Sequence, residues 1–362
     1  MRKVAIAMSG GVDSSVAAAL LKERGFDVIG ITMVNDSGTQ AVEAARNAAL
    51  KLGIPHYVIE IKEAFFEKII KPFCLEYIRG RTPNPCTKCN KIIKFGFLLE
   101  RARELGAELF ATGHYARVEF CKGRYLLKKG KDPDKDQSYM LYLLTQEELS
   151  RTLFPLGELT KEEVRRSAEE LKLPARAESQ DICFVPDGDY GSFIKKLFPE
   201  AARKGPILNT KGEVIGEHKG LIFYTVGQRR GIGIRAGRPL YVVDLDPSRN
   251  AIIVGEEEEL YSQEFIVGEA NFIPFEKLEG ALEVEVKIRY RHPEIPALIF
   301  PLEGGEILVK LSRPERAVTP GQAAVFYRGD IVIGGGTIIK AKRQIGTWPK
   351  ASMAERGNGG LL

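Results

Sequence analysis

The segment that most constrains this chain is Ser9–Ser15, which reads Ser-Gly-Gly-Val-Asp-Ser-Ser and follows the apolar run Val4–Met8. An apolar strand, a Gly-Gly turn and a hydroxyl-rich helix start predict an anion cradle. Glycine lets backbone N–H groups approach an oxyanion, and the helix N-terminus adds its positive dipole end. The loop has no lysine after its glycines, although loops for γ-phosphoryl transfer require one. We therefore expect phosphate binding without γ-phosphoryl transfer.

Length and composition bound the class of protein. The chain has 362 residues, which is more than one core usually serves, so we expect two or three domains. Hydrophobic residues at 44% and charged residues at 28% are typical of a globular protein with a sizeable core. The N-terminus has no secretory pattern, and no apolar run approaches the roughly 18 residues of a membrane span. We expect a cytoplasmic protein, and its net charge of +5 is compatible with a polyanionic partner.

Apolar runs alternate with helical patterns in the N-terminal part of the chain. Four strands are predicted, at Val4–Met8, Val28–Met33, Tyr57–Ile61 and Leu109–Thr112. Helical patterns lie between them, at Val12–Arg24, Gln40–Leu52, Ala64–Ile78 and Lys91–Leu105. Such alternation predicts an α/β fold with a doubly wound parallel sheet. The phosphate loop then lies at the carboxyl edge of the sheet, where ligands bind, and Met33 faces the same crevice.

The pattern changes after these strands. A hairpin is predicted around Lys122-Gly123, and Thr160–Glu163 is a capping box that opens a helix ending before Pro174. Beyond about residue 200, short strand-like runs follow one another: Glu213–Ile215, Leu221–Val226, Leu240–Leu245, Ala251–Val254, Ala297–Phe300, Ile307–Leu311, Ala323–Tyr327 and Ile331–Ile333. The segment Leu282–Tyr290 alternates throughout, which predicts a half-buried strand with Arg289 on its solvent face. These runs predict a small central β-rich domain and a C-terminal barrel or sandwich.

The segment Gly80–Asn90 carries the second chemical cluster, with two prolines and a Cys-x-x-Cys pair. We expect an extended loop that enters a helix near Lys91, which places Cys89 at the helix N-terminus beside Lys88 and Lys91. The helix dipole and the lysines then stabilise a thiolate there. Five cysteines in a chain this long do not form a disulfide scaffold, and the pair can be a disulfide, half of a zinc site or part of an iron–sulfur site. Four-ligand zinc needs a second pair, which the sequence lacks.

Ordered motifs give this chain a family resemblance. The pattern Ser-Gly-Gly-x-Asp-Ser resembles the pyrophosphate loop of the N-type ATP pyrophosphatases, which cleave ATP between its α- and β-phosphates. From the first strand to about residue 340 the chain resembles the bacterial tRNA-specific 2-thiouridylases. The motifs that carry the resemblance are A-M-S-G-G-V-D-S-S at 7–15, G-R-T-P-N-P at 80–85, C-N-K-I-I-K-F at 89–95, T-G-H-Y at 112–115, K-D-Q-S-Y at 135–139, D-I-C-F at 181–184, V-G-Q-R-R-G at 226–231 and V-K-I-R-Y-R at 286–291.

The resemblance implies a role for each motif. ATP contacts are implied for Ala7, Met8, Ser9, Gly10, Gly11, Val12, Asp13, Ser14, Met33 and Gly113. The wobble uridine of tRNA is bordered by Asn84 and Pro85, and tRNA contacts are implied for Lys135, Asp136, Gln137, Arg289 and Tyr290. Cys89 is the partner thiol, and Cys183 is the carrier of a persulfide received from a sulfur-relay protein or a cysteine desulfurase. Many family members carry aspartate, a candidate acid–base group, where this chain has Cys86.

The resemblance also implies a domain division and a reaction. We expect a catalytic domain at 1–198, a central β-rich domain at 199–262, a β-barrel at 263–345 and a flexible tail at 346–362. Transfer of AMP to the uracil C2 oxygen creates a leaving group, and a sulfur nucleophile then displaces AMP. ATP and Mg²⁺ are the expected cofactors. As an alternative, a [4Fe–4S] cluster on Cys86, Cys89 and Cys183 replaces the persulfide relay.

Several interpretations stay open. Asp13 either helps to hold Mg²⁺ or is a charge in the first turn of a helix. The basic residues Arg229-Arg230 and Arg235–Arg238 either follow a phosphate backbone or form a solvated loop. A small-molecule adenylating ligase shares the phosphate loop but does not need Cys89 and Cys183. A lysidine-type tRNA ligase lacks those thiols, and an RNA-binding or sulfur-carrier protein needs no ATP loop.

Overall fold

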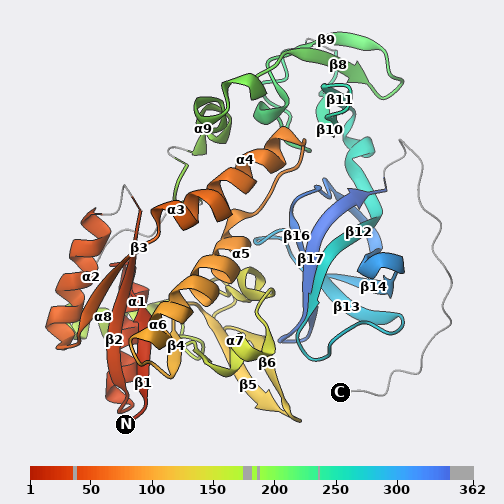
Figure 1. Ribbon diagram of the computed structural model, residues 1–362. Coiled ribbons are helices and arrows are strands. Elements are labelled where there is room, and N and C mark those ends of the chain that lie inside the picture. Colours follow the sequence, from red (N-terminus) through yellow and green to blue (C-terminus); the bar gives the residue numbers. More distant parts are fainter. Residues whose placement is uncertain (36–38, 174–181, 186–187, 235–236, 343–362) are drawn as a thin grey trace. The chain divides into compact units, whose positions relative to one another are not determined.

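The computed structural model describes residues 1–35, 39–173, 182–185, 188–234 and 237–342 (Figure 1). The chain forms two compact units. Unit 1 comprises residues 1–70, 86–180 and 328–333, and unit 2 comprises residues 71–85, 181–327 and 334 onward. The expected flexible tail at 346–362 lies outside the described residues.

Unit 1 is built on a five-stranded, all-parallel sheet with the order β3-β2-β1-β4-β7. Its strands are β1 (Lys3–Ala7), β2 (Asp27–Val34), β3 (His56–Glu60), β4 (Leu109–Ala111) and β7 (Thr152–Leu153). The strand order reverses beside β1, because β2 and β3 follow on one side and β4 and β7 on the other. An open parallel sheet binds its ligand at such a reversal. The predicted doubly wound fold is confirmed.

Helices pack on both faces of this sheet: Phe110 of β4 contacts Phe95 of η2 (Asn90–Leu98) with ring centroids 5.7 Å apart, whereas its neighbours Leu109 and Ala111 face a second set of helices. The buried side chains of β1 pack with α1 (Val12–Glu23), α2 (Thr39–Leu52) and α8 (Lys161–Glu170) in one apolar cluster. The remaining helical segments of unit 1 are α3 (Lys62–Phe65), η1 (Phe66–Ile70), α5 (Pro85–Cys89), η2 (Asn90–Leu98), α6 (Leu99–Glu104), η3 (Ser138–Leu141) and α7 (Gln146–Ser150). The capping box predicted at Thr160 is present, with Glu163 N donating to Thr160 Oγ1 and Thr160 N donating to Glu163 Oε2.

The predicted hairpin is also present in unit 1. Strands β5 (Ala116–Cys121) and β6 (Arg124–Lys129) pair antiparallel, and both turn residues, Lys122 and Gly123, have positive φ. Positive φ at both central residues is the geometry that matches the twist of two-residue hairpins.

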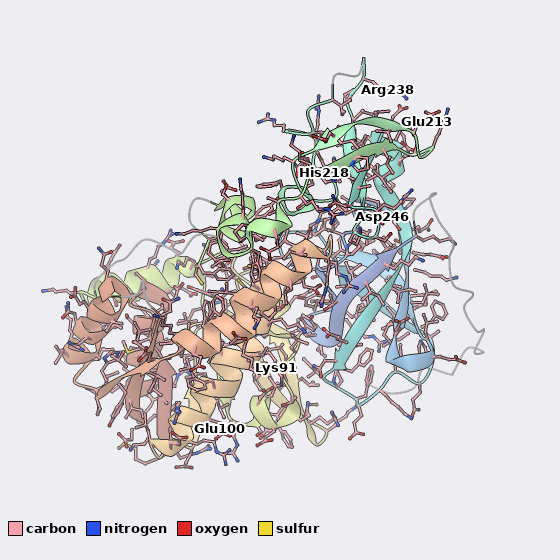
Figure 2. The ribbon with its side chains drawn as sticks, turned by 45° about the horizontal axis from the view of Figure 1, so that its top comes forward. Lys91, Glu100, Glu213, His218, Arg238 and Asp246 are labelled. Atoms are coloured by element: carbon pink, nitrogen blue, oxygen red, sulfur yellow. The ribbon has the colours of Figure 1, made fainter. Side chains whose placement is uncertain are left out.

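Unit 2 contains a small β module and a barrel. The module has the strand order β10-β11-β8-β9, formed by β8 (Gly205–Asn209), β9 (Val214–His218), β10 (Tyr241–Asp246) and β11 (Ala251–Gly255). Figure 2 labels His218 at the end of β9 and Asp246 at the end of β10. The predicted strand Leu221–Val226 is wrong, because Leu221–Phe223 forms a short 3-10 helix, η6. Leu221 and Tyr224 are buried in the module's apolar cluster from this turn.

The barrel is a closed sheet of six strands in the order β12-β15-β14-β13-β16-β17, and β12 pairs with β17 to close it. Its strands are β12 (Tyr261–Phe272), β13 (Leu282–Lys287), β14 (Ile295–Pro301), β15 (Ile307–Arg316), β16 (Ala323–Arg328) and β17 (Ile331–Ala341). The alternation predicted for β13 is correct up to Lys287, with Val284 and Val286 buried. Unit 2 also contains α4 (Lys71–Ile78), α9 (Tyr190–Leu197) and the short helices η5 (Pro199–Ala201), η7 (Glu257–Leu260) and η8 (Glu303–Gly305). Among the described helices, none combines the length and the apolar character needed to cross a membrane.

Candidate active site

The phosphate loop joins β1 to α1 at the carboxyl edge of the sheet, where the strand order reverses. Ser14 closes the loop on itself: its Oγ accepts from Ser9 N at 3.1 Å and donates to Gly11 O at 3.2 Å. Gly11 occupies the N-cap of α1 and makes no side-chain cap. The first N–H groups of a helix have no partners within the helix, so this turn presents donors and the positive dipole end to an anion.

Close packing requires glycine at two positions of the site. Gly10 has φ +73°, and a Cβ there would lie 2.6 Å from Ala41 O. At Gly113, a Cβ would lie 2.9 Å from Ser14 N. Both backbones therefore approach their neighbours more closely than any other residue allows. The structure brings Gly113 directly against the phosphate loop, while Met33 and Ala7 lie near the carboxyl ends of β2 and β1.

A lysine that the sequence reasoning missed reaches the phosphate loop. Lys161, the first residue of α8, places its Nζ 2.8 Å from Asp13 Oδ1 and 2.9 Å from Asp13 Oδ2. The lysine side chain is only 9% exposed and the Asp13 side chain 32%, so the pair is largely shielded from water. Tyr115 Oη donates a further hydrogen bond of 2.9 Å to Asp13 Oδ1. The loop thus has a nearby cation after all, supplied from 148 residues along the chain.

The T-G-H-Y and K-D-Q-S-Y motifs are joined by hydrogen bonds. Gln137 Oε1 accepts from Tyr115 N at 3.1 Å, and Gln137 N donates to Tyr115 O at 2.9 Å. Asp136 is buried, and its carboxylate accepts from Gly130 N, Ser138 N and Ser138 Oγ. Asp136 therefore holds its own loop together, whereas Lys135 beside it is half-buried. These bonds connect the segment expected to contact tRNA to Tyr115, and through it to Asp13.

The helix that carries the cysteine pair starts earlier than predicted. Helix α5 begins at Pro85, and the chain stays helical through η2 and α6, with Cys89 itself in the αR conformation. Proline suits a first helical position and asparagine an N-cap, so Asn84-Pro85 was the start signal. The expectation that Cys89 lies at a helix N-terminus is wrong, and the dipole acts instead on Cys86 in the first turn. Lys91, which Figure 2 labels and which was expected beside the Cys89 thiol, places its Nζ 2.6 Å from Glu148 Oε2 in an ion pair.

The other cysteines differ in exposure. Cys183 is exposed in unit 2, and its neighbour Phe184 packs edge-on against Phe73 of α4 with ring centroids 5.2 Å apart. Cys74 is fully buried, and burial raises the pKa of its thiol to about 11. Such a thiol is protonated and inert at neutral pH. Cys121 ends β5, and the segment Glu178–Asp181 before Cys183 lies outside the described residues.

The expected tRNA contacts in unit 2 need one correction. β13 ends at Lys287, so Arg289 is not a strand residue with its side chain in solvent. It lies in a turn closed by His292 N donating to Arg289 O, and its Nη2 donates to Arg316 O at 3.0 Å. Arg289 is half-buried, as is Tyr290. Arg229 and Arg230 are exposed, Arg238 forms an ion pair with Glu256, and Arg235 lies outside the described residues.

Two sets of side chains were expected to bind metals: Asp13 for Mg²⁺, and three cysteines for an iron–sulfur cluster. Asp13 accepts hydrogen bonds from Lys161 and Tyr115, which fits a charge of the first helical turn, and direct binding of Mg²⁺ by this carboxylate stays a prediction. Among the described residues, no three His, Cys, Asp or Glu side chains gather as a metal site. Cys86 and Cys89 belong to unit 1 and Cys183 to unit 2, so the cluster alternative stays a prediction.

The fold and the loop define a nucleotide-binding protein of the pyrophosphate-loop class, with a β module and a barrel added after its parallel sheet. Residues 2–187 match the family model described as a tRNA methyl transferase HUP domain. Residues 191–256 match the tRNA methyl transferase PRC-barrel domain, and residues 262–338 match the aminomethyltransferase beta-barrel domain.

Curated relatives identify the family. The chain is 52% identical over 359 residues to a tRNA-specific 2-thiouridylase of Caldanaerobacter subterraneus subsp. tengcongensis, covering 94% of this chain and 99% of that protein. It is 50% identical to the enzyme of that name from Natranaerobius thermophilus (94% and 98% covered) and 46% identical to that from Clostridium acetobutylicum (93% and 99% covered). The chain belongs to the tRNA-specific 2-thiouridylase family, which confirms the resemblance.

Proposed function

We propose that this protein replaces the C2 oxygen of the tRNA wobble uridine with sulfur, in a reaction that consumes ATP. The observation that carries the proposal is the closed phosphate loop at the strand-order reversal, in a chain that also carries Cys89 and Cys183. The names of the curated relatives support the substrate and the product. A protein that acts on cytoplasmic tRNA belongs in the cytoplasm.

The first half-reaction is adenylation of the base. Hydroxide is a poor leaving group from a uracil carbonyl, so AMP is first transferred from ATP to the C2 oxygen, and pyrophosphate leaves. The donors at the start of α1 suit the pyrophosphate. Lys161 neutralises Asp13, which removes a repulsive charge from the side of an incoming triphosphate.

The second half-reaction is sulfur transfer. The terminal sulfur of a Cys183 persulfide attacks C2, and the C–O bond breaks as AMP leaves. The Cys89 thiolate then attacks Cys183 Sγ, and the electron pair of the broken S–S bond moves to the sulfur on uracil. A Cys89–Cys183 disulfide remains, and an external thiol reduces it before the next turnover. Exposure of Cys183 suits loading by a sulfur-relay protein or a cysteine desulfurase.

The tRNA contacts fall to residues of both units. Asn84 and Pro85 border the target base, with Cys86 next to them at the start of α5. Lys135 and Gln137 of unit 1 and Arg289 and Tyr290 of unit 2 contact the tRNA, as the family resemblance implies. Asp136, which is buried and internally bonded, supports the loop that presents its neighbours.

Other reactions are distinguishable. The family model is described as a methyl transferase domain, but a loop that binds pyrophosphate has no use in methyl transfer, and the curated relatives carry the thiouridylase name. A cluster on Cys86, Cys89 and Cys183 is the variant of sulfur transfer that an anaerobic absorption spectrum with iron analysis detects. A small-molecule adenylating ligase would form AMP without tRNA.

The test of the proposed function is whether purified protein forms AMP and pyrophosphate from ATP only when unmodified tRNA is present. With a persulfide donor, mass spectrometry of the digested tRNA should then show 2-thiouridine. AMP formation at the same rate without tRNA would favour a small-molecule substrate, and a tRNA product without sulfur would overturn the proposal.

A further inference from the structure

The residues 80–85, which we call the base loop, are held by the barrel within unit 2. Thr82 N donates to Pro320 O at 2.9 Å, and Gln322 Nε2 donates to Thr82 O at 2.8 Å. Both backbone polar groups of Thr82 therefore find partners in one turn of the barrel. Residues 82 and 322 are 240 positions apart in the sequence, so no local signal reveals this contact.

The turn that holds Thr82 is itself rigid. Gly321 N donates to Ile338 O and Ile338 N donates to Gln322 O, both at 2.8 Å, which fixes the turn on β17. Gly321 has φ +94°, and a Cβ there would lie 2.7 Å from Thr82 N. Conformation and space both require glycine at this position. The base loop thus rests directly on the backbone of the barrel.

The other side of Thr82 is supported by the segment that leads into the V-G-Q-R-R-G motif. Thr82 Oγ1 donates to Thr225 Oγ1 at 3.5 Å, and Thr225 Oγ1 lies 3.2 Å from Tyr190 Oη. The Tyr190 ring stacks on Tyr77 of α4 with centroids 4.7 Å apart. Thr225 therefore contacts the side chain of Thr82, and it is supported in turn by Tyr190 of α9, which stacks on α4.

We propose that Gln322 is a positioning residue for the target base. The inference rests on the proposed function, because it takes Asn84 and Pro85 as the residues beside that base. Asn84 is two residues after Thr82, and Pro83 and Pro85 restrict the intervening backbone. The position of Thr82 therefore determines the position of Asn84. The barrel fixes the position of Thr82 through Gln322.

Limited trypsin digestion tests directly, without tRNA or ATP, whether Gln322 keeps the base loop on the barrel. Arg81 precedes Thr82 and is 40% exposed, so its peptide bond is cut when the base loop leaves the barrel. Loss of one side-chain hydrogen bond should speed cleavage after Arg81 about fivefold in Gln322→Ala, provided that opening is fast compared with cleavage. The matched control is Gln263→Ala, because Gln263 Nε2 donates to Leu311 O at 3.0 Å within the barrel and does not touch the base loop.

Thiolation kinetics test the role in the reaction. Gln322→Ala should lower kcat for 2-thiouridine formation about tenfold, since small displacements of reacting groups are costly, and leave KM for tRNA within about twofold. Gln322→Glu has the same shape but no N–H to donate, so it should behave like Gln322→Ala. Gln263→Ala should keep the wild-type kcat, although thermal melts should show a similar loss of stability for both alanine variants.

The outcomes separate the inference from the proposed function. If cleavage after Arg81 is unchanged in Gln322→Ala, Gln322 does not hold the base loop on the barrel. If cleavage is faster but kcat is unchanged, Gln322 does not position the target base. Both outcomes leave the proposed function intact. A fall in kcat in Gln263→Ala equal to that in Gln322→Ala reduces the effect to general destabilisation and overturns the inference. Wild-type protein that makes no 2-thiouridine overturns the proposed function, and this role with it, whatever the trypsin result.

Discussion

Unit 1 and unit 2 hold their important loops by different means. In unit 1 the phosphate loop is held by side chains, through the Ser14 hydroxyl and the Lys161–Asp13 ion pair. In unit 2 the base loop is held mainly through its backbone, with both polar groups of Thr82 bonded to the barrel turn. A charged network responds to a charged ligand, whereas a backbone contact fixes a position. The difference suits one unit to nucleotide binding and the other to placement of a base.

The cysteines are also divided between the two units. Cys86 and Cys89 belong to unit 1, and Cys183 belongs to unit 2. If adenylation depends on unit 1 and sulfur loading on Cys183, adenylation should survive the loss of Cys183, and persulfide loading of Cys183 should survive damage to the phosphate loop.

Cys183→Ser should abolish multiple-turnover thiolation and leave tRNA-dependent AMP formation intact, because no sulfur carrier remains while the phosphate loop is unchanged. Cys89→Ser should stop turnover as well. Cys74→Ser and Cys121→Ser are the controls, and mass spectrometry of digested tRNA with an assay of AMP provides both readings. Loss of AMP formation in a folded Cys183→Ser protein would break the separation of the two units, and full thiolation would refute the persulfide relay.

Lys161→Met should slow AMP formation about a hundredfold, because Asp13 is left as an uncompensated charge beside the phosphate site. Binding of tRNA in a filter assay should stay near the wild-type level. The control is Lys128→Met, since Lys128 also pairs with carboxylates in unit 1 but does so at Asp330 and Glu119. Equal losses in the two variants would assign Lys161 to stability alone.

Arg289→Ala should lower the free energy of unfolding by about 1 kcal/mol, because it removes the hydrogen bond to Arg316 O. It should also weaken tRNA binding by about 1 kcal/mol and flatten the salt dependence of binding. Arg313→Ala removes an equal charge from an exposed position of the same barrel and serves as control. Thermal melts and filter binding at several salt concentrations measure both effects, and an unchanged melting temperature would contradict the structural part.

His114 makes unit 1 sensitive to acid. Burial lowers the pKa of His114 well below 6.5, so the folded protein keeps the ring neutral while the unfolded chain binds a proton. Its contribution to stability is therefore complete above pH 6.5 and declines as the pH falls below that value. Between pH 7.5 and pH 5.5, urea unfolding should show a stability loss that is larger in wild type than in His114→Gln, by roughly 1 kcal/mol. The other histidines are common to both proteins, so equal losses would refute the assignment.

Much of the sheet could be predicted from the sequence because its signals are local. Apolar runs separated by helical periods located β1 to β4, and the Gly-Gly turn placed the phosphate loop after the first strand, at the carboxyl edge of the sheet. The barrel was harder to predict from the sequence. β12 was missed because its register shifts break the alternation of buried and exposed residues. The domain boundaries remain a prediction, beside family matches that end at 187, 256 and 338.

The candidate site was predictable only where its chemistry is local. The serines and glycines of the phosphate loop could be named from their spacing. Lys161 could not, because a lysine in the first turn of a capped helix is usually solvated, and its partner is 148 residues away. The early start of α5 was available in Asn84-Pro85, but the two prolines were interpreted as an extended loop. Arg289 was misplaced because the strand pattern continues in the sequence after the strand has ended.

The chain passes from unit 2 to unit 1 at the start of α5. Residues up to Pro85 belong to unit 2 and residues from Cys86 onward to unit 1, and Pro85 is both the last residue of the base loop and the first residue of the cysteine helix. At a rise of about 1.5 Å per residue, Cys89 lies roughly 6 Å along the helix from Pro85. The continuous helix therefore keeps Cys89 within a short stretch of chain of Asn84. If the base loop binds the target uridine as proposed, the entropy of bringing the base near the Cys89 thiol is lost largely on folding and not on binding.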